Sequence, residues 1–331
     1  MDVAVADVIV EPDGQGCLLV SWKLEGPDTA VDVAVGPTPE AVDHTHSVTV
    51  AAGEHSIRLE GLDAGRHYVS VAPSGAGPGL VAAERRVPFE GVTNFRDLGG
   101  YRTADGGWTR WGLVFRADAL HRFTAADLAL YERLGMRVVY DLRGDVERET
   151  RPNPMPSLQL ALLSKVREQE GDEPPDRSGM SAADGEQFLR DIYKGMLEHA
   201  GPLIGELLTG LTDPDGLPAV FHCAGGKDRT GLTAALLLEL LGVARDDVLD
   251  DYELTARFRL REHQQDAVKH LLEGGMPPEA AASVLGTPRW AMDETLVELD
   301  ADYGGVVAYL TGPAGMTPAD LDALRQRLVT R

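Results

Sequence analysis

The 331-residue chain has few cysteines, little positive charge and no long apolar run. Its only cysteines are Cys17 and Cys223, which excludes a disulfide-stabilised scaffold and is typical of a reducing cytosol. Lysine and arginine number 31 against 53 aspartate and glutamate residues, so the formal net charge is −22. Such a chain repels phosphate backbones and anionic lipid, so we expect no nucleic-acid partner and no adsorption to a membrane.

Membrane-crossing and export signals are also missing from the sequence. The most apolar helical segment, 232–243, is interrupted by Glu239 and is shorter than the roughly 20 residues that span a bilayer. The first residues, MDVAVAD, show neither the basic region nor the apolar core of a signal peptide. We therefore expect a cytoplasmic protein without stable membrane insertion. Any anionic substrate then needs a local positive pocket.

Residues 1–88 show a β pattern, in which short runs of Val, Ile and aromatic residues alternate with Gly, Pro and Asp turns. The pattern predicts an all-β sandwich. The predicted strands are 3–10, 17–24, 31–35, 47–50, 56–59, 67–72 and 80–87. Trp22 in the second strand, and the Leu62-to-Tyr68 spacing of a tyrosine corner, resemble a fibronectin type III module. Such a module could bind a protein partner, present substrate or serve packing.

From about residue 89 to 331 the pattern becomes that of an α/β domain. Short apolar runs at 137–142 and 219–223 predict buried strands of a central sheet flanked by helices. The predicted helices are 125–134, 185–211, 230–241, 246–260, 278–285, 291–299 and 318–329. Pro202 divides the longest pattern, so we expect two helices there. The acidic stretch 168–181, rich in Pro and Gly, predicts an exposed loop.

One short segment, HCAGGKDRTG, carries the chemistry. The predicted strand delivers Cys223 into a loop with Ala224, Gly225 and Gly226, and Arg229 closes the loop where a helix begins. Successive backbone N–H groups in such a loop bind an anion, and the helix dipole adds about half a positive charge. The arginine fork can hold two phosphate oxygens. The same positive surroundings favour the thiolate, which is the nucleophilic form of cysteine.

The spacing Cys-x5-Arg, preceded by His222 and followed by Thr-Gly, is the signature of the cysteine-dependent protein tyrosine phosphatase superfamily. The HCxxGKDR loop resembles that of bacterial tyrosine/serine protein phosphatases. NFRDLGGY at 94–101, RADAL at 116–120, and DLR at 141–143 with Glu147 extend the resemblance, as does the tail at 303–310. It implies hydrolysis of phosphotyrosine, and also of phosphoserine or phosphothreonine, through a cysteinyl-phosphate. No metal or other cofactor is implied.

Three further residues of the loop have expected roles. Thr230 would donate its hydroxyl to the sulfur, and His222 would fix the loop through its ring nitrogens. Lys227 resembles the lysine of lipid phosphatases in the superfamily and would then receive a second phosphate or a phosphoinositide headgroup. The alternative is that Lys227 only offsets Asp228. Ala224, where some lipid phosphatases have another lysine, weakens the lipid interpretation.

The general acid is not marked by the Trp-Pro-Asp loop that many superfamily members use. Asp228 is the first candidate, because relatives with this loop are thought to use that aspartate. Its alternative role is to pair with Lys227 or Arg229. Asp141 is the second candidate, since α/β sites gather where strands end. Its alternative role is a salt bridge to Arg143 or Arg229.

Several other residues are expected to have structural roles. Asn94, Arg96 and Asp97 are expected to tie down a buried turn, and Arg116 to pair with a carboxylate. Residues 276–285 would form either a lid or, as we expect, an ordinary surface helix. Three rival functions stay open: a phosphatase of phosphoinositides or small phosphate esters, a phosphate-binding module without turnover, and a sulfur transferase.

Overall fold

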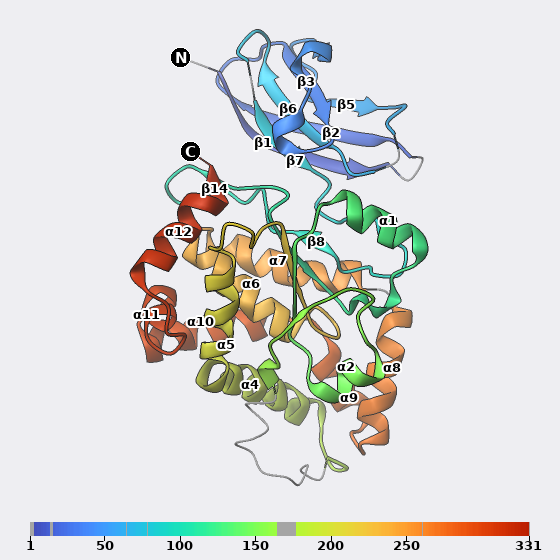
Figure 1. The fold of residues 1–331 in the computed structure, drawn as a ribbon, viewed down its shortest axis with the longest axis vertical. Coiled ribbons are helices and arrows are strands. Elements are labelled where there is room, and N and C mark those ends of the chain that lie inside the picture. The colour runs from blue at the N-terminus through green and yellow to red at the C-terminus, as the bar shows by residue number, and fades with distance from the viewer. Residues whose placement is uncertain are drawn as a thin grey trace. The chain divides into compact units, whose positions relative to one another are not determined.

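A computed structural model describes residues 3–330, apart from 14–15, 64, 78, 164–176 and 260. The chain divides into two compact units (Figure 1). The first contains Met1–Pro88 with Arg110–Gly112, and the second contains Phe89–Thr109 with Leu113–Arg331. Most of the predicted loop at 168–181 lies outside the described residues.

The first unit consists of two antiparallel sheets, with strand orders β1-β2-β5 and β4-β3-β6-β7. The strands are β1 (Ala4–Pro12), β2 (Leu18–Glu25), β3 (Val31–Gly36), β4 (Val48–Val50), β5 (Ser56–Leu59), β6 (Tyr68–Pro73) and β7 (Leu80–Ala83). Side chains from both sheets, including Trp22 and Val33, form one core. The prediction of an all-β N-terminal region is thus confirmed, although the last strand ends four residues early.

Tyr68, the residue expected to form a tyrosine corner, is buried at the start of β6. Its hydroxyl accepts a hydrogen bond of 2.6 Å from Arg66. Trp111, from the short segment that the later chain contributes, joins the same core. The likeness to a fibronectin type III module stays a prediction.

The second unit is built on a five-stranded mixed sheet with the order β12-β11-β13-β10-β8. These strands are β8 (Arg96–Asp97), β10 (Val114–Ala117), β11 (Val138–Asp141), β12 (Leu158–Gln159) and β13 (Ala219–His222). A separate pair joins β9 (Trp108–Thr109) to β14 (Val329–Thr330). Strand β13 runs parallel to both neighbours, and all four of its residues are buried. The carboxyl ends of the three central strands therefore meet at one edge of the sheet.

Helices gather around this sheet (Figure 1). They are α1 (Ala125–Arg133), α2 (Asp145–Thr150), α4 (Ala182–His199), α5 (Gly201–Gly210), α6 (Asp228–Leu240), α7 (Arg245–Phe258), α8 (Arg261–Glu273), α9 (Pro278–Leu285), α10 (Arg289–Tyr303), α11 (Val306–Thr311) and α12 (Pro318–Leu328). The α/β class is confirmed, and so is the division at Pro202, which lies in the first turn of α5, where proline is tolerated. Across the described residues, no helix combines the length and apolarity that a membrane crossing needs.

Candidate active site

The predicted loop connects the central strand to the most buried helix. Cys223 follows β13 directly, and α6 begins five residues later at Asp228. The Cys223 side chain is buried, at 2% exposure. No side chain caps the N-terminus of α6, so the N–H groups of its first turn lack the acceptor that a cap supplies. An anion beside Cys223 would fill that role.

The carbonyl groups of the loop are tied to the body of the domain. The backbone N–H of Ala119 donates to the oxygen of Ala224 at 3.2 Å. Asn94 Nδ2 donates to the oxygens of Gly225 at 3.1 Å and Gly226 at 3.3 Å. Because each trans peptide holds its N–H opposite to its C=O, the next N–H groups point away from that body, into the loop. The loop is therefore built as an anion nest.

A cluster of buried charged side chains also holds the carbonyl groups of the loop. Arg116 Nη2 donates to the oxygen of Gly226 at 2.8 Å, and Arg116 also pairs with Asp251. Arg96 donates to Asp251 at 3.0 Å and to the side-chain oxygen of Asn94. All of these side chains are at most 1% exposed. Arg116 thus forms the carboxylate pair expected of it, whereas Asn94 ties the catalytic loop and not the turn that the sequence predicted.

A positive φ of 63° at Gly226 explains why glycine occupies the tightest point of the loop. A Cβ there would lie 2.6 Å from the oxygen of Ala117 and 2.7 Å from Asn94 Nδ2. Any larger residue would therefore push the loop off the groups that orient it.

Arg229 is oriented by Glu147, which the sequence marked only as part of the family string. Nη1 donates to Glu147 Oε2 at 2.6 Å and Nη2 donates to Oε1 at 3.1 Å. Nη1 also donates to the oxygen of Leu142 at 3.3 Å. Of the five guanidinium N–H groups, this leaves Nε–H and one N–H of Nη2, which lie on the same edge. That edge matches two oxygens of a phosphate.

Arg229 and Glu147 each shift the pKa of the other. Burial alone would lower the pKa of Arg229, but Cys223 and Glu147 outweigh it and raise that pKa. Burial would likewise raise the pKa of Glu147, yet its hydrogen bonds and charge contact with Arg229 lower it. Glu147 is itself held by the backbone N–H of Gly144 in the first turn of α2. The guanidinium is thus positioned through a short helix.

His222 and Asp141 belong to a second buried hydrogen-bond network, next to Cys223. Burial lowers the pKa of His222 to about 4, so its ring is neutral near pH 7. Asn153 Nδ2 donates to His222 Nε2 at 2.9 Å, and His222 Nδ1 donates to the oxygen of Cys223 at 3.2 Å. Sequence reasoning did not identify Asn153, because nothing local marks an asparagine 69 residues from its partner.

Asp141 takes the ion pair with Arg143 that was its alternative role. Arg143 donates from Nε at 2.8 Å and from Nη2 at 2.7 Å. Burial would raise the pKa of Asp141, but the hydrogen bonds and charges of Arg143 and the contact with His222 lower it. A carboxyl with a lowered pKa is a poor proton donor, so this geometry favours a structural role.

Lys227 contacts the end of α9. Its buried Nζ donates to the carbonyl oxygens of Val284, at 2.5 Å, and of Gly286, at 2.7 Å, at the end of α9. Nζ also lies 3.2 Å from Asp228 Oδ1, which agrees with the offsetting role expected as the alternative. Burial lowers the pKa of Lys227. The ammonium thus attaches the loop to α9 at the end where the helix dipole favours a cation.

Asp228 and Thr230 keep functional groups near the loop. The side chain of Asp228 is 29% exposed at the first position of α6. The Thr230 hydroxyl is fully buried and has no hydrogen-bond partner among the described residues. The expected hydrogen bond from Thr230 to the sulfur is therefore not formed in this structure.

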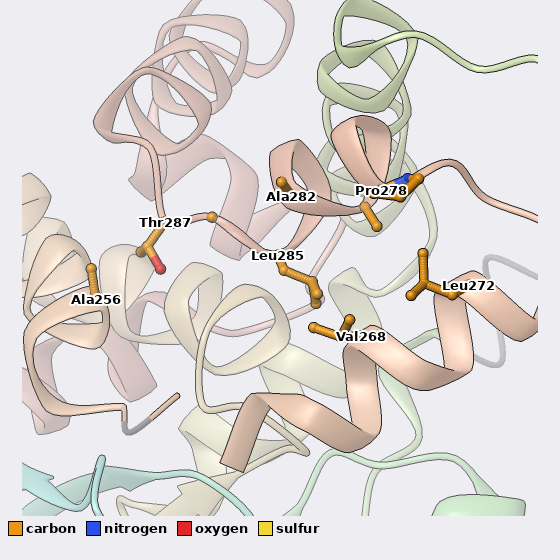
Figure 2. A pocket seen from close by; sticks show the side chains of 9 residues that line it. Ala256, Val268, Leu272, Pro278, Ala282, Leu285 and Thr287 are labelled. Carbon is orange, nitrogen blue, oxygen red and sulfur yellow. The ribbon is translucent and has the colours of Figure 1, made fainter. Parts of the chain in front are cut away.

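An apolar cavity of about 370 Å³ lies between α7, α8 and α9 (Figure 2). Val268, Leu272 and Leu285 point into it. Gly286, which accepts from Lys227, also lines it. The described residues that line this cavity carry no charged side chain, so they lack the groups that bind phosphate. Helix α9, the segment weighed as a lid, packs on α4 through buried Ala280, which lies against Gly185.

Comparison with known protein families identifies the family of this chain. Residues 87–330 match the tyrosine phosphatase family. The chain belongs to this family. The matched segment contains the whole of the loop, the Arg229–Glu147 pair and the buried network around His222. The family predicted from the sequence is therefore confirmed.

Individual relatives of this phosphatase-family chain are distant. It is 28% identical, over 73% of its length and 88% of the relative, to a putative tyrosine-protein phosphatase, H16_A0669, from Cupriavidus necator. It is 26% identical to the triple specificity protein phosphatase PtpB of Mycobacterium tuberculosis, over 73% of this chain and 98% of PtpB. A tyrosine-protein phosphatase of Nostoc commune is also 26% identical, over 88% of this chain and 92% of the relative.

Proposed function

We propose that this phosphatase hydrolyses phosphotyrosine in proteins through a cysteinyl-phosphate on Cys223. The observation that carries the proposal is the position of the buried thiol, in a loop whose carbonyl oxygens accept hydrogen bonds from Asn94, Arg116 and Ala119. The loop amides and Arg229 hold the equatorial oxygens of the phosphoryl group. A bond forms between Sγ and phosphorus while the bond from phosphorus to the tyrosine oxygen breaks.

Asp228 is our proposed general acid. Its carboxylate lies 3.2 Å from Lys227, whereas Asp141 and Glu147 are each held by two hydrogen bonds from an arginine. In the first step Asp228 gives its proton to the departing phenolate oxygen. In the second step it takes a proton from the water that attacks phosphorus, so that inorganic phosphate leaves and the thiolate is restored.

A protein substrate is favoured over a phosphoinositide because of Lys227. The lipid interpretation needs this lysine to receive a second phosphate, but its Nζ is buried on two carbonyl oxygens and beside Asp228. The name of the Mycobacterium tuberculosis relative, a triple specificity protein phosphatase, supports testing phosphoserine as well.

The test is phosphate release without added metal from a phosphotyrosine peptide, a phosphoserine peptide and a monophosphoinositide. We expect the phosphotyrosine peptide to be the best substrate. Cys223→Ser should abolish turnover, and Cys17→Ser, which changes the partly exposed cysteine of the first unit, should keep it. Full activity in Cys223→Ser would refute the mechanism, and a preference for the lipid would refute the substrate class.

A further inference from the structure

The guanidinium of Arg259 lies flat against the catalytic loop. A Cβ placed on Gly225 would fall 2.9 Å from Cζ of Arg259 and 3.0 and 3.1 Å from its two Nη atoms. These nearly equal distances mean that the face of the guanidinium, and not its edge, covers Gly225. Arg259 directly follows α7, where its backbone N–H bonds to Thr255. Its N–H edges are therefore directed past the loop.

Arg259 differs from the other arginines around the loop. Arg116 pairs with Asp251, Arg143 with Asp141 and Arg229 with Glu147. The side chain of Arg259 has no hydrogen-bond or ion-pair partner in the described parts of the chain. In a chain with a net charge of −22, a half-buried guanidinium without a carboxylate partner is unusual.

The acidic residues on α7 do not supply that partner. Asp246, Asp250 and Glu253 pair with Arg289, and Asp251 pairs with Arg96 and Arg116. Lys227, the other cation beside the loop, is held by α9 carbonyls and Asp228. Among the described residues, Arg259 is thus a cation beside the loop whose donors no partner takes, and its guanidinium lies against Gly225 of that loop.

We propose that Arg259 binds a second anionic group of the substrate, next to the scissile phosphate. This specificity rests on the proposed function of the Cys223 loop. One guanidinium matches one carboxylate or phosphate in a bidentate pair. The substrate class is therefore a phosphotyrosine peptide with an acidic or phosphorylated residue beside the phosphotyrosine. The strongly negative charge of the chain opposes an anionic membrane as the source of that group.

The experiment compares two phosphotyrosine peptides that differ only in the flanking residue, glutamate in one and glutamine in the other. Affinity is measured on the full chain carrying Cys223→Ser, with and without Arg259→Gln, and kcat/KM is measured on the chain with Cys223 intact. We expect Arg259→Gln to weaken the binding of the acidic peptide by about fivefold. Binding of the neutral peptide should change by less than about twofold. Arg257→Gln, on the exposed end of α7, is the matched control and should preserve the acidic preference.

Each other result contradicts the assignment. An equal loss on both peptides would make Arg259 a support of the loop and not a specificity residue. No acidic preference in the chain with Arg259 intact would also overturn it, as would tighter binding of soluble inositol bisphosphate than of the acidic peptide. Failure of the proposed function can be told apart, because it would appear as absent turnover. The binding comparison in the Cys223→Ser background would still show whether Arg259 contributes to the acidic preference.

Discussion

Glu147→Ala removes the carboxylate that orients the catalytic arginine. In the native structure, Glu147 occupies the end of the Arg229 guanidinium with two hydrogen bonds, at 2.6 and 3.1 Å. Without that carboxylate, the guanidinium can rotate and offer phosphate a different edge. The variant therefore tests whether the division of the arginine donors between Glu147 and phosphate matters for catalysis.

The size of the effect follows from exposure. The side chain of Arg229 is 10% exposed and that of Glu147 is 38% exposed, so the pair lies between a buried and a surface ion pair. We expect the free energy of unfolding to fall by only about 1 kcal/mol. Transition-state binding should lose about 1.5–3 kcal/mol, the range for a hydrogen bond to a charged group, or about 10- to 100-fold in kcat/KM.

The assay is kcat/KM on a phosphotyrosine peptide, together with the inhibition constant of inorganic phosphate. Glu147→Gln, which keeps one acceptor oxygen, should lie between the wild type and Glu147→Ala. Because the pKa of Glu147 is lowered in the folded state, the stability gained from the pair is complete above the ordinary value of 4.5. It is lost as the pH falls through the lowered pKa. If Glu147→Ala left both kcat/KM and the inhibition constant of inorganic phosphate unchanged, the orienting role of Glu147 would be refuted.

Three further predictions concern the loop and its support. His222 has a folded-state pKa of about 4 against an ordinary 6.5, so stability falls as pH drops through this window; urea unfolding should show wild type losing about 2 kcal/mol more than His222→Gln between pH 7 and 5. Gly226→Ala should cost about 1–3 kcal/mol in unfolding free energy and most of the activity, because of the positive φ and the 2.6 Å approach to Ala117; a stable, active variant would contradict this. Asp228→Asn should lower kcat/KM by about 100-fold or more for phosphotyrosine, and much less for p-nitrophenyl phosphate, whose leaving group needs less protonation; equal losses on both would remove Asp228 as the acid.

The sequence was most informative where the determinants are local. The strand, glycines and arginine of the catalytic loop lie within a few residues, so the loop, the family and α6 followed from the pattern. Strand β10 escaped prediction because buried Arg116 interrupts its apolar run, and the carboxylate that pairs with Arg116 belongs to Asp251, 135 residues away. Helix α8 escaped because its sequence is largely polar.

Site residues that act through distant partners could not be found in this way. Asn153 and Arg259 acquire their positions only when separate elements come together. The same holds for the direction of Lys227, which depends on the end of α9, 57 residues away. For residues of this kind, the amino-acid type indicates a capacity to bind, but the tertiary contacts decide what is bound.

The ties on the loop carbonyls also bear on how the enzyme folds. Asn94 reaches Gly225 across 131 residues and Arg116 reaches Gly226 across 110. Contacts of such separation close late, because loop-closure entropy opposes them until the intervening chain is organised. The nucleophile would then remain without an ordered phosphate cradle through most of refolding. Recovery of activity should therefore follow the last step of native packing and not the earlier appearance of helical signal.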